Sequence, residues 1–320
     1  MVQSEQYGCV GAICYATQSG LGIECKAFFD HGLIDEMYVV PHSHYPTQDW
    51  YPNACKSIDE LLDKCDTIIA FETFFDWQVI KKARALGKQT ILVTHYECTP
   101  NPPYYWPDKL IAPSDLDYDT YKDVGLPIIR LNIPVEASWK LRKKAKVFVH
   151  NAGHGGLLGR NSTLEVLHAW EMVKSPAQLI LRAQNGGYES SDPRITIING
   201  SVPYEDLWKE GDVFILPDKF GGSFLPMQEA WASGLAVMAA DRYPTNAWLP
   251  RDLLIPVFGY EWKRIGMDFE SAIIKASDIA QCIDAVYDTD ISAYSKEGKQ
   301  WAAANSWGIL KRKYKEFIQL

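Results

Sequence analysis

The sequence predicts an α/β protein built from two doubly wound units, and three observations lead to that prediction. Short β-rich runs alternate with helical segments along the chain, which is typical of βαβ units that form a mostly parallel sheet. The alternation restarts near residue 146, after a basic connector at 136–146. The 320 residues suit one large domain or two of ordinary size, and the 47% of apolar residues matches a folded globular chain.

The first unit is expected to contain six strands, because six short runs of apolar and β-branched residues are separated by helical or polar stretches. Helices are predicted at 57–64 and 76–86. The strands are predicted at 7–15, 36–40, 67–70, 89–94, 109–112 and 128–131.

The second unit repeats this rhythm. Its strands are predicted at 146–153, 178–182, 194–198, 212–216 and 235–239, and its helices at 162–173, 204–209 and 225–233. The last segment, 296–320, is interpreted as one helix or two. Its aromatic residues form an apolar face that has to dock elsewhere to stay ordered.

Charge and cysteine content limit the function and the compartment. Lys plus Arg number 32 and Asp plus Glu number 40, so the formal net charge is −8 and a generic polyanion binder is disfavoured. Residues 1–138 hold 10 basic and 19 acidic residues, a net charge of −9. The remaining residues hold 22 basic and 21 acidic residues, a net charge of +1. No apolar run approaches the roughly 20 residues of a membrane span, and the start lacks a basic leader. Seven cysteines without a C-x-x-C pair favour reduced thiols, so a cytoplasmic protein is expected.

Tandem α/β units bind ligands at the carboxyl ends of their strands, so the turns found there are the candidate sites. The first such turn, 16–22, contains Gly20 and Gly22, which allow a ligand to approach the backbone closely. The G-x-G-x-x-G dinucleotide pattern fails because Cys25 stands at its last position. A plain tight turn explains the two glycines almost as well.

The second turn, 151–162, contains four glycines, including Gly155, followed by Arg160 and a helix. Backbone amides, the helix dipole and the guanidinium together would form an anion site suited to a diphosphate. It is no P-loop, because no Gly-Lys-Ser/Thr closes it. The alternative is a flexible loop with an exposed arginine.

The third turn, 216–229, is the most specific. A hydrophobic strand ends at Pro217, a Gly-Gly-Ser turn follows, and Pro226 stands where the first turn of a helix tolerates proline. Glu229 then lies in the first turns of that helix, where its carboxylate could accept hydrogen bonds from both hydroxyls of a ribose. The alternative is a glutamate that only favours the helix dipole, worth about 0.3–1 kcal/mol.

The run VFILPDKFGGSFLPMQEAWASGLAVMAAD resembles the donor-site segment of retaining glycosyltransferases of the GT-B fold, most closely family 4. INGSVPYEDLWKEGDVFILP, GRNSTLEVLHAW and the C-terminal SWGILKRKYKEF are similar to further stretches of that family. The resemblance implies two Rossmann-like domains facing across a cleft, with a C-terminal helix that crosses back. The first domain (1–138) would be the acceptor side, the second (139–300) would bind the nucleotide sugar, and 301–320 would return to the first.

By this resemblance Glu229 would bind the donor ribose and His95 would face the transferred sugar, and these two are the catalytic candidates. Arg160 with nearby backbone amides would hold the diphosphate. The full set of candidate donor-binding residues is Gly20, Gly22, Gly155, Arg160, Gly221, Gly222, Ser223, Phe224, Leu225 and Glu229. One departure is that Gly221 stands where the family has a sugar-binding glutamate. Another is that Asn161 stands at the place of the family's lysine.

The predicted function is retaining transfer of a hexosyl or pentosyl group from a UDP- or GDP-type donor to an acceptor hydroxyl. No metal or other cofactor is expected, because the D-x-D clusters at 115–117 and 288–290 look like surface acids. The acceptor is expected to be a glycan or a small molecule, with a modified DNA base also open. The alternatives are a sugar-nucleotide-binding protein without turnover and a non-hydrolysing sugar-nucleotide epimerase.

Overall fold

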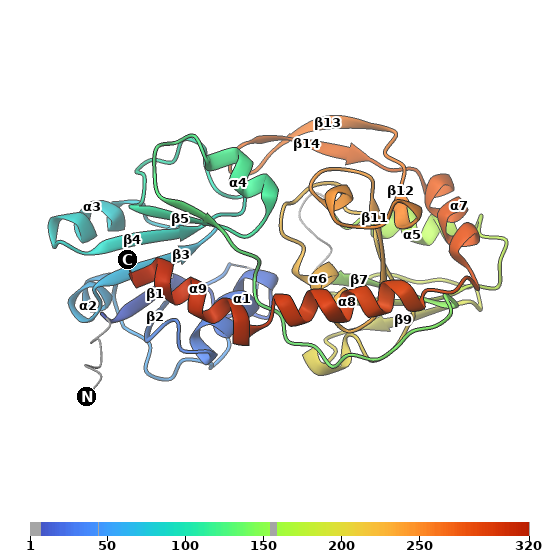
Figure 1. The fold of residues 1–320 in the computed structure, drawn as a ribbon, viewed down its shortest axis with the longest axis horizontal. Helices are drawn as coiled ribbons and strands as arrows, with labels where there is room; N and C mark the ends of the chain where they lie inside the picture. Colours follow the sequence, from blue (N-terminus) through green and yellow to red (C-terminus); the bar gives the residue numbers. More distant parts are fainter. Residues whose placement is uncertain (1–7, 44, 154–158, 320) are drawn as a thin grey trace. The chain divides into compact units, whose positions relative to one another are not determined.

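The computed structural model describes residues 8–43, 45–153 and 159–319, which form two compact units (Figure 1). The first unit comprises the chain up to Pro134, Arg264–Met267 and the segment that begins at Trp307. The second comprises Val135–Lys263 and Asp268–Ser306. The predicted domain limits of 1–138, 139–300 and 301–320 stay predictions, because a unit defined by packing need not coincide with a functional domain.

The first unit is a six-stranded parallel sheet in the order β2-β1-β3-β4-β5-β6. Its strands are β1 (Val10–Cys14), β2 (Glu36–Val39), β3 (Thr67–Phe71), β4 (Gln89–Val93), β5 (Lys109–Ala112) and β6 (Ile128–Arg130). Its helices are α1 (Gly20–Asp30), α2 (Ile58–Lys64), α3 (Gln78–Ala85), α4 (Asp115–Tyr121) and α9 (Trp307–Gln319). Serines begin three of these helices, each accepting a backbone N–H in the first turn: Ser19, Ser57 and Ser114.

One face of this sheet packs against α1 and α9. Phe28 of α1 lies edge-on to Phe71 of β3 and to Trp307 and Tyr314 of α9. The Tyr314 side chain is fully buried, and its hydroxyl donates to the carbonyl of Asn132 (2.9 Å). The apolar face of the last helix therefore completes the core of the first unit.

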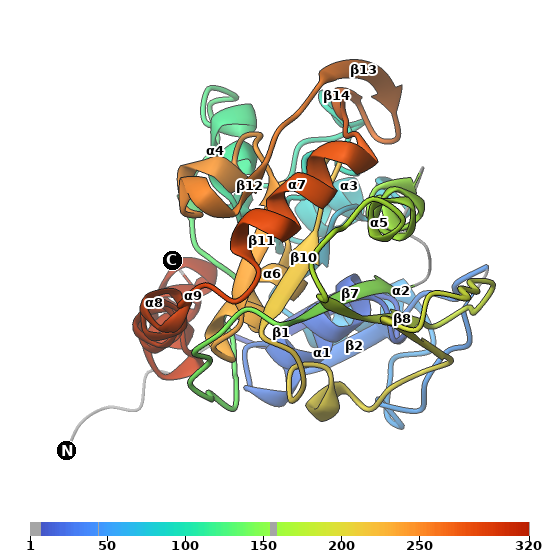
Figure 2. The same cartoon turned by 90° about the vertical axis from the view of Figure 1, so that its right-hand side faces the viewer.

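The second unit is a parallel sheet in the order β12-β11-β10-β7-β8-β9, with a separate two-stranded sheet of β13 and β14 (Figure 2). Its strands are β7 (Val147–Gly153), β8 (Gln178–Ala183), β9 (Ile195–Asn199), β10 (Val213–Leu216), β11 (Ala236–Ala240), β12 (Leu254–Ile255), β13 (Gly259–Arg264) and β14 (Asp268–Ile273). Its helices are α5 (Thr163–Trp170), α6 (Leu225–Ala232), α7 (Ala276–Val286) and α8 (Ser292–Ala304), with 3₁₀ turns η2 (Tyr204–Asp206), η3 (Thr245–Ala247) and η4 (Arg251–Leu253).

Alternation along the strands divides the second core into two layers. Val213 and Ile215 of β10 belong to the apolar cluster of α5 and α7, whereas Phe214 and Leu216 belong to that of α6. Successive side chains of a strand point to opposite faces, so both faces of the sheet are covered by helices. The fold class predicted from the sequence, two doubly wound α/β units, is confirmed, and the second sheet has one more strand, β12, than the five that were predicted.

Two local predictions are wrong. The helix predicted at 204–209 is only the 3₁₀ turn η2, followed by irregular turns. Asp117 is fully buried inside α4 rather than a surface acid, because it stands in the first turn of a helix whose N-cap, Ser114, hydrogen-bonds to it. Asp115, on the same helix, is exposed as expected.

Candidate functional site

The carboxyl ends of β7 and β10 bring the second and third glycine-rich turns together within the second unit. The backbone N–H of Lys219 donates to the carbonyl of Arg160 (2.9 Å), and the Lys219 ammonium pairs with Glu165 of α5 (2.7 Å). Arg160 and the 218–224 turn are therefore neighbours. Gly155 lies outside the described residues.

A buried histidine fixes where α5 begins. His150 on β7 is fully buried; its Nδ1 lies 2.8 Å from the Ile215 carbonyl and its Nε2 lies 2.9 Å from the Thr163 hydroxyl. Burial lowers the pKa of His150 to about 4, so the ring is neutral, donating from Nδ1 and accepting at Nε2. This uncharged bridge joins β7, β10 and the first residue of α5.

The first turns of α5 and α6 have amide groups that no capping side chain satisfies. The residues before them, Ser162 and Phe224, make no side-chain capping hydrogen bond, and Ser162 has left-handed backbone angles. The hydroxyl oxygen of Ser223 is buried without a hydrogen-bond partner among the described residues. Unsatisfied donors at helix N-termini, with the positive end of the dipole, favour an anionic ligand.

Two guanidinium groups lie on the ring of Phe224. The Arg160 Cζ atom is 5.9 Å and the Arg242 Cζ atom is 5.2 Å from the ring centroid, distances typical of cation–π contacts. Arg242 also pairs with the carboxylate of Asp218 and donates from Nη2 to the Gly221 carbonyl (2.8 Å). Asp218 is fully buried and Arg242 is 5% exposed, so each neutralises the other in a site with little water.

Gly221 has a conformation and surroundings that only glycine fits. Its φ of +124° is rarely adopted by residues with a side chain, and a Cβ atom placed there would lie 2.6 Å from Phe224 Cζ. The departure from the family's glutamate therefore has a physical reason, because the Phe224 ring fills the space that a side chain at 221 would need. Gly222 is buried beside it, and Ser223 and Leu225 are half-buried.

Glu229 is buried in α6 with a single oxygen engaged by a tyrosine. It is 4% exposed, and the hydroxyl of Tyr204, in η2, donates to its Oε1. Burial raises the pKa of Glu229 to about 7, although the hydrogen bond from Tyr204 acts in the opposite direction. The carboxyl group therefore changes its charge near neutral pH.

In the first unit, His95 stands just past the end of β4 and is 9% exposed. Its Nε2 lies 3.2 Å from Oε2 of Glu24 on α1. The two glycines of the first turn differ from one another. A Cβ at Gly22 would collide with the carbonyl oxygen of Thr17, whereas a Cβ at Gly20, the exposed first residue of α1, meets nothing within 4 Å. Gly22 therefore has a packing role of its own.

Sequence reasoning missed Arg242, Tyr204 and Glu24. Arg242 follows β11 in ADRYP, a turn without glycine, and its partner Asp218 lies 24 residues earlier. Tyr204 was assigned to a helix, and Glu24 to no role. No local sequence pattern predicts a role for these three residues, because each role depends on a contact with a residue that is distant in the chain.

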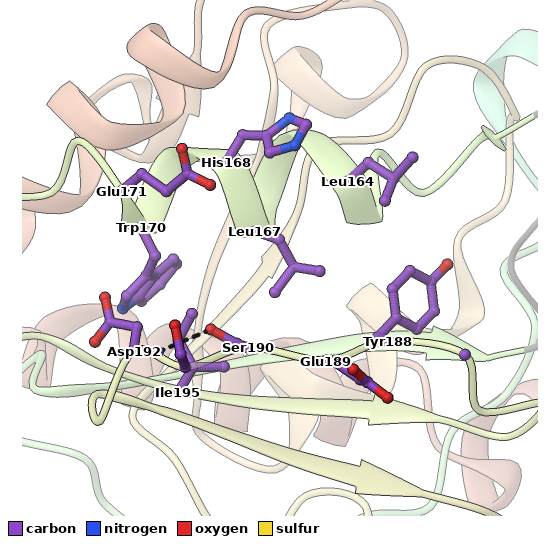
Figure 3. Close-up of a pocket in the computed structure, with 12 residues that line it drawn as sticks. Leu164, Leu167, His168, Trp170, Glu171, Tyr188, Glu189, Ser190, Asp192 and Ile195 are labelled. Carbon is purple, nitrogen blue, oxygen red and sulfur yellow. Dashed lines mark hydrogen bonds between the residues drawn. The ribbon is translucent and has the colours of Figure 1, made fainter.

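A separate hollow of about 450 Å³ lies along α5 in the second unit (Figure 3). Leu164, Leu167 and His168 of α5 line one wall, and Tyr188 and Asp192 of the β8–β9 connection line the other. The connection has no helix there, which leaves the outer side of α5 open. It contains none of the predicted site residues.

Within residues 8–43, 45–153 and 159–319, no three His, Cys, Asp or Glu side chains are grouped as a metal ion would require. No helix in the described part of the chain has the length and apolar character needed to cross a bilayer. All seven cysteines are free thiols, and Cys9 Sγ lies 3.2 Å from Cys65 Sγ.

Comparison with known proteins identifies the fold. No protein-family model and no curated protein sequence matches the chain. Among solved structures it is similar to Anabaena HepE in complex with UDP and glucose, with a TM-score of 0.67, 11% identity and coverage of 98% of this chain and 100% of that one. It is also similar to a glycosyltransferase from Rickettsia africae (TM-score 0.63, 12% identity, 98% of both chains).

A third similar structure is the sucrose-phosphate synthase of Thermosynechococcus elongatus, with a TM-score of 0.61, 12% identity, and coverage of 96% of this chain and 97% of that one. The chain spans 56% of the length of the pneumococcal O-GlcNAc transferase GtfA, to which it is also similar (TM-score 0.55, 13% identity). The chain has the GT-B fold of glycosyltransferases.

Proposed function

We propose that the protein is a retaining glycosyltransferase that moves a hexosyl or pentosyl group from a UDP- or GDP-type donor to an acceptor hydroxyl. The observation that supports the proposal is that Arg160 lies beside the residues that begin two helices without side-chain caps, α5 and α6, and that α6 also carries the buried Glu229. Parallel α/β sheets bind their ligands at this edge.

In this proposal Arg160 and the amides of Gly222 to Leu225 hold the diphosphate, and Glu229 accepts hydrogen bonds from the ribose hydroxyls. The leaving diphosphate gains negative charge as the glycosidic bond breaks, and preorganised donors and cations stabilise that charge without a metal ion. The buried hydroxyl of Ser223 supplies one further donor at this place.

The proposal also includes three residues of the first unit: Gly20 and Gly22 as donor-binding residues, and His95 as the residue that faces the transferred sugar. The proposed acceptor is a glycan, a small molecule or a DNA base. The support for these assignments is the sequence resemblance and, for His95, its pairing with a buried carboxylate. The proposed compartment is the cytoplasm, in keeping with seven free thiols.

A sugar-nucleotide-binding protein without turnover is the second candidate. It is favoured by one observation, the absence of a side chain at Gly221, where Phe224 fills the space. Both candidates require donor binding, and only the transferase requires an acceptor and releases the nucleoside diphosphate.

The first experiment is a thermal-shift series with UDP, GDP and ADP and their common sugars, each with and without EDTA. We expect one diphosphate to raise the melting temperature, EDTA to have no effect, and Arg160→Ala to abolish the shift. Arg251→Ala, an exposed arginine of the same unit, is the matched control. Stabilisation by no nucleotide, or an equal shift in the Arg160→Ala protein, would contradict the donor site.

The second experiment supplies the stabilising donor together with hydroxylated acceptors. Release of the diphosphate that depends on an acceptor, with a product of the same anomeric configuration as the donor by NMR, supports the retaining transferase. A product with the opposite anomeric configuration would show that the enzyme is not a retaining one. Tight donor binding without product from any acceptor would favour the sugar-nucleotide-binding protein.

A further inference from the structure

His95 is held in place by its own loop in the first unit. Its backbone N–H donates to the hydroxyl oxygen of Thr99 (3.0 Å), and the Thr99 hydroxyl donates to the carbonyl of Glu72 (2.8 Å). The next residue, Tyr96, donates its N–H to Asp117 Oδ1 (2.7 Å). The backbone around His95 is therefore held against the residue that follows β3 and against α4.

The partner of the ring is a carboxylate that is distant in the sequence. Glu24 is 3% exposed, its Oε2 lies 3.2 Å from His95 Nε2, and its Oε1 is buried without a hydrogen-bond partner among the described residues. A carboxylate only accepts hydrogen bonds when ionised, so Nε2 carries the proton. A buried carboxylate with one oxygen unsatisfied is costly unless a cation stands beside it, and His95 is the group placed to supply that charge.

The charged groups that raise the pKa of the His95 ring most are acids. They are Glu24 on α1, Glu72 after β3 and Asp117 on α4, and Glu97 lies close to Asp117. Burial acts against a charged imidazole, yet these carboxylates together raise the pKa of His95 to about 10. Asp117 has its own pKa raised to about 7 by burial, while the charge of His95 lowers it.

His150 shows that burial alone does not produce this state. Both histidines are buried and both stand at a sheet, but the partners of His150 are a carbonyl and a hydroxyl. Its pKa falls to about 4, and the ring stays neutral. The difference between the two rings follows from the carboxylates around His95, of which Glu24 contacts the ring directly.

We propose that Glu24 is a positioning residue that holds His95 as an imidazolium, so that His95 serves the transfer reaction as a permanent cation and hydrogen-bond donor and never as the base that takes the acceptor proton. The role in transfer rests on the proposed function, whereas the charge of the ring does not. An imidazolium has no lone pair with which to accept a proton, and it favours negative charge developing nearby.

The charge is tested by NMR of the full chain labelled with ¹⁵N-histidine, between pH 5.5 and 9.5. We expect the ring of His95 to remain an imidazolium up to about pH 9 and to begin to titrate only above it, and His150, the internal reference, to remain neutral. Glu24→Gln should lower the His95 pKa by at least two units, so that the ring titrates inside the range. Asp30→Asn, an exposed acid on the same helix, should leave the titration unchanged. A wild-type His95 that titrates near 6.5 would overturn the proposal.

The catalytic role is tested by the pH dependence of kcat in the same proteins. Glu24→Gln should keep its activity near pH 6 and lose tenfold or more by pH 9 as His95 loses its proton, with the acceptor KM unchanged. A merely structural role would lower kcat equally at every pH, and activity that rises as His95 is deprotonated would make it a base. Either result would overturn the proposal. If no acceptor is turned over, the proposed function fails while the NMR titration still decides the charge.

Discussion

The two units share an α/β plan of six parallel strands, and they bury opposite arrangements of charge at the ends of those strands. In the first, one histidine is surrounded by the carboxylates of Glu24, Glu72 and Asp117. In the second, one carboxylate, Asp218, is paired with Arg242, and a further guanidinium lies on the same phenyl ring. The common fold decides where polar side chains can gather, and the residues of the loops and of the first turns of the helices decide the sign of the charge there.

The net charges follow the same division, since the acidity of the chain lies in residues 1–138. The buried charged clusters are expected to affect stability more than the net charge does, because salt screens exposed charges strongly and buried charges much less. Each cluster can be broken separately, and the effect on its own unit measures how much the fold depends on it.

The largest effect is expected from breaking the buried pair of the second unit. Arg242→Ala leaves the fully buried Asp218 without its cation, which should destabilise the unit by about 3–5 kcal/mol. Urea unfolding followed by tryptophan fluorescence measures the loss, with Arg251→Ala as the exposed control. The double variant Arg242→Met/Asp218→Asn should recover most of it. A loss below 1 kcal/mol would mean that the pair is not buried in solution.

Gly221→Ala should destabilise the second unit by about 2–3 kcal/mol, because it adds backbone strain and a collision with the ring of Phe224. Gly187→Ala is the matched control, since its φ is also positive but a Cβ there meets nothing within 4 Å. Unfolding midpoints in urea compare the two variants. Equal losses would show that strain alone acts at 221 and that the ring gives way.

The raised pKa of Glu229 predicts that the free energy of unfolding falls by about 2.5 kcal/mol between pH 5 and pH 8. The folded protein holds this proton more tightly than the unfolded chain, so the stabilisation is complete below pH 4.5 and is lost as the pH rises through 7. Glu229→Gln does not titrate and should therefore gain stability relative to the wild type between pH 5 and pH 8. Melting temperatures across that range test it, with the exposed Glu270→Gln as control. Parallel curves for Glu229→Gln and the wild type would show that the carboxyl keeps an ordinary pKa.

The smallest effect is expected where charges are exposed. Lys26 and Asp30 pair on the surface of α1, and Asp30→Asn should change the stability by less than about 0.5 kcal/mol. The urea midpoint of the first unit is the measurement. A larger loss would remove the contrast between buried and exposed charge on which the comparison depends.

The strands of both sheets could be predicted from the sequence because alternation and apolar runs are local properties. The observed strands β4 and β10, for example, lie within the predicted runs 89–94 and 212–216. Glu229 could be proposed for the site because proline and glycine mark the turn before its helix. The rest of the site could not be predicted, since Arg242 depends on Asp218, and Glu24 depends on a histidine 71 residues further along.

Phe224 illustrates the same limit within one turn. The resemblance noted in the sequence predicts a glutamate where Gly221 stands, and it gives no sign that the ring of Phe224, three residues later, fills the space that a side chain at 221 would need. Asp117 was misjudged for a related reason, because a D-x-D pattern in a helix places one acid outward and the other inward.

The docking of α9 in the first unit has a consequence for synthesis on the ribosome. Trp307, Leu310, Tyr314 and Ile318 fill the same core as Phe28 and Phe71. The ribosome has to add residues 135–306 before this helix emerges, a delay on the order of 10 s at 5–20 residues per second. During that time the first unit exposes an apolar face, and the whole of the second unit, which ends at Ser306, is synthesised before that face is covered. The unit that begins first is thus completed last, and its nascent form is the one that needs protection from aggregation.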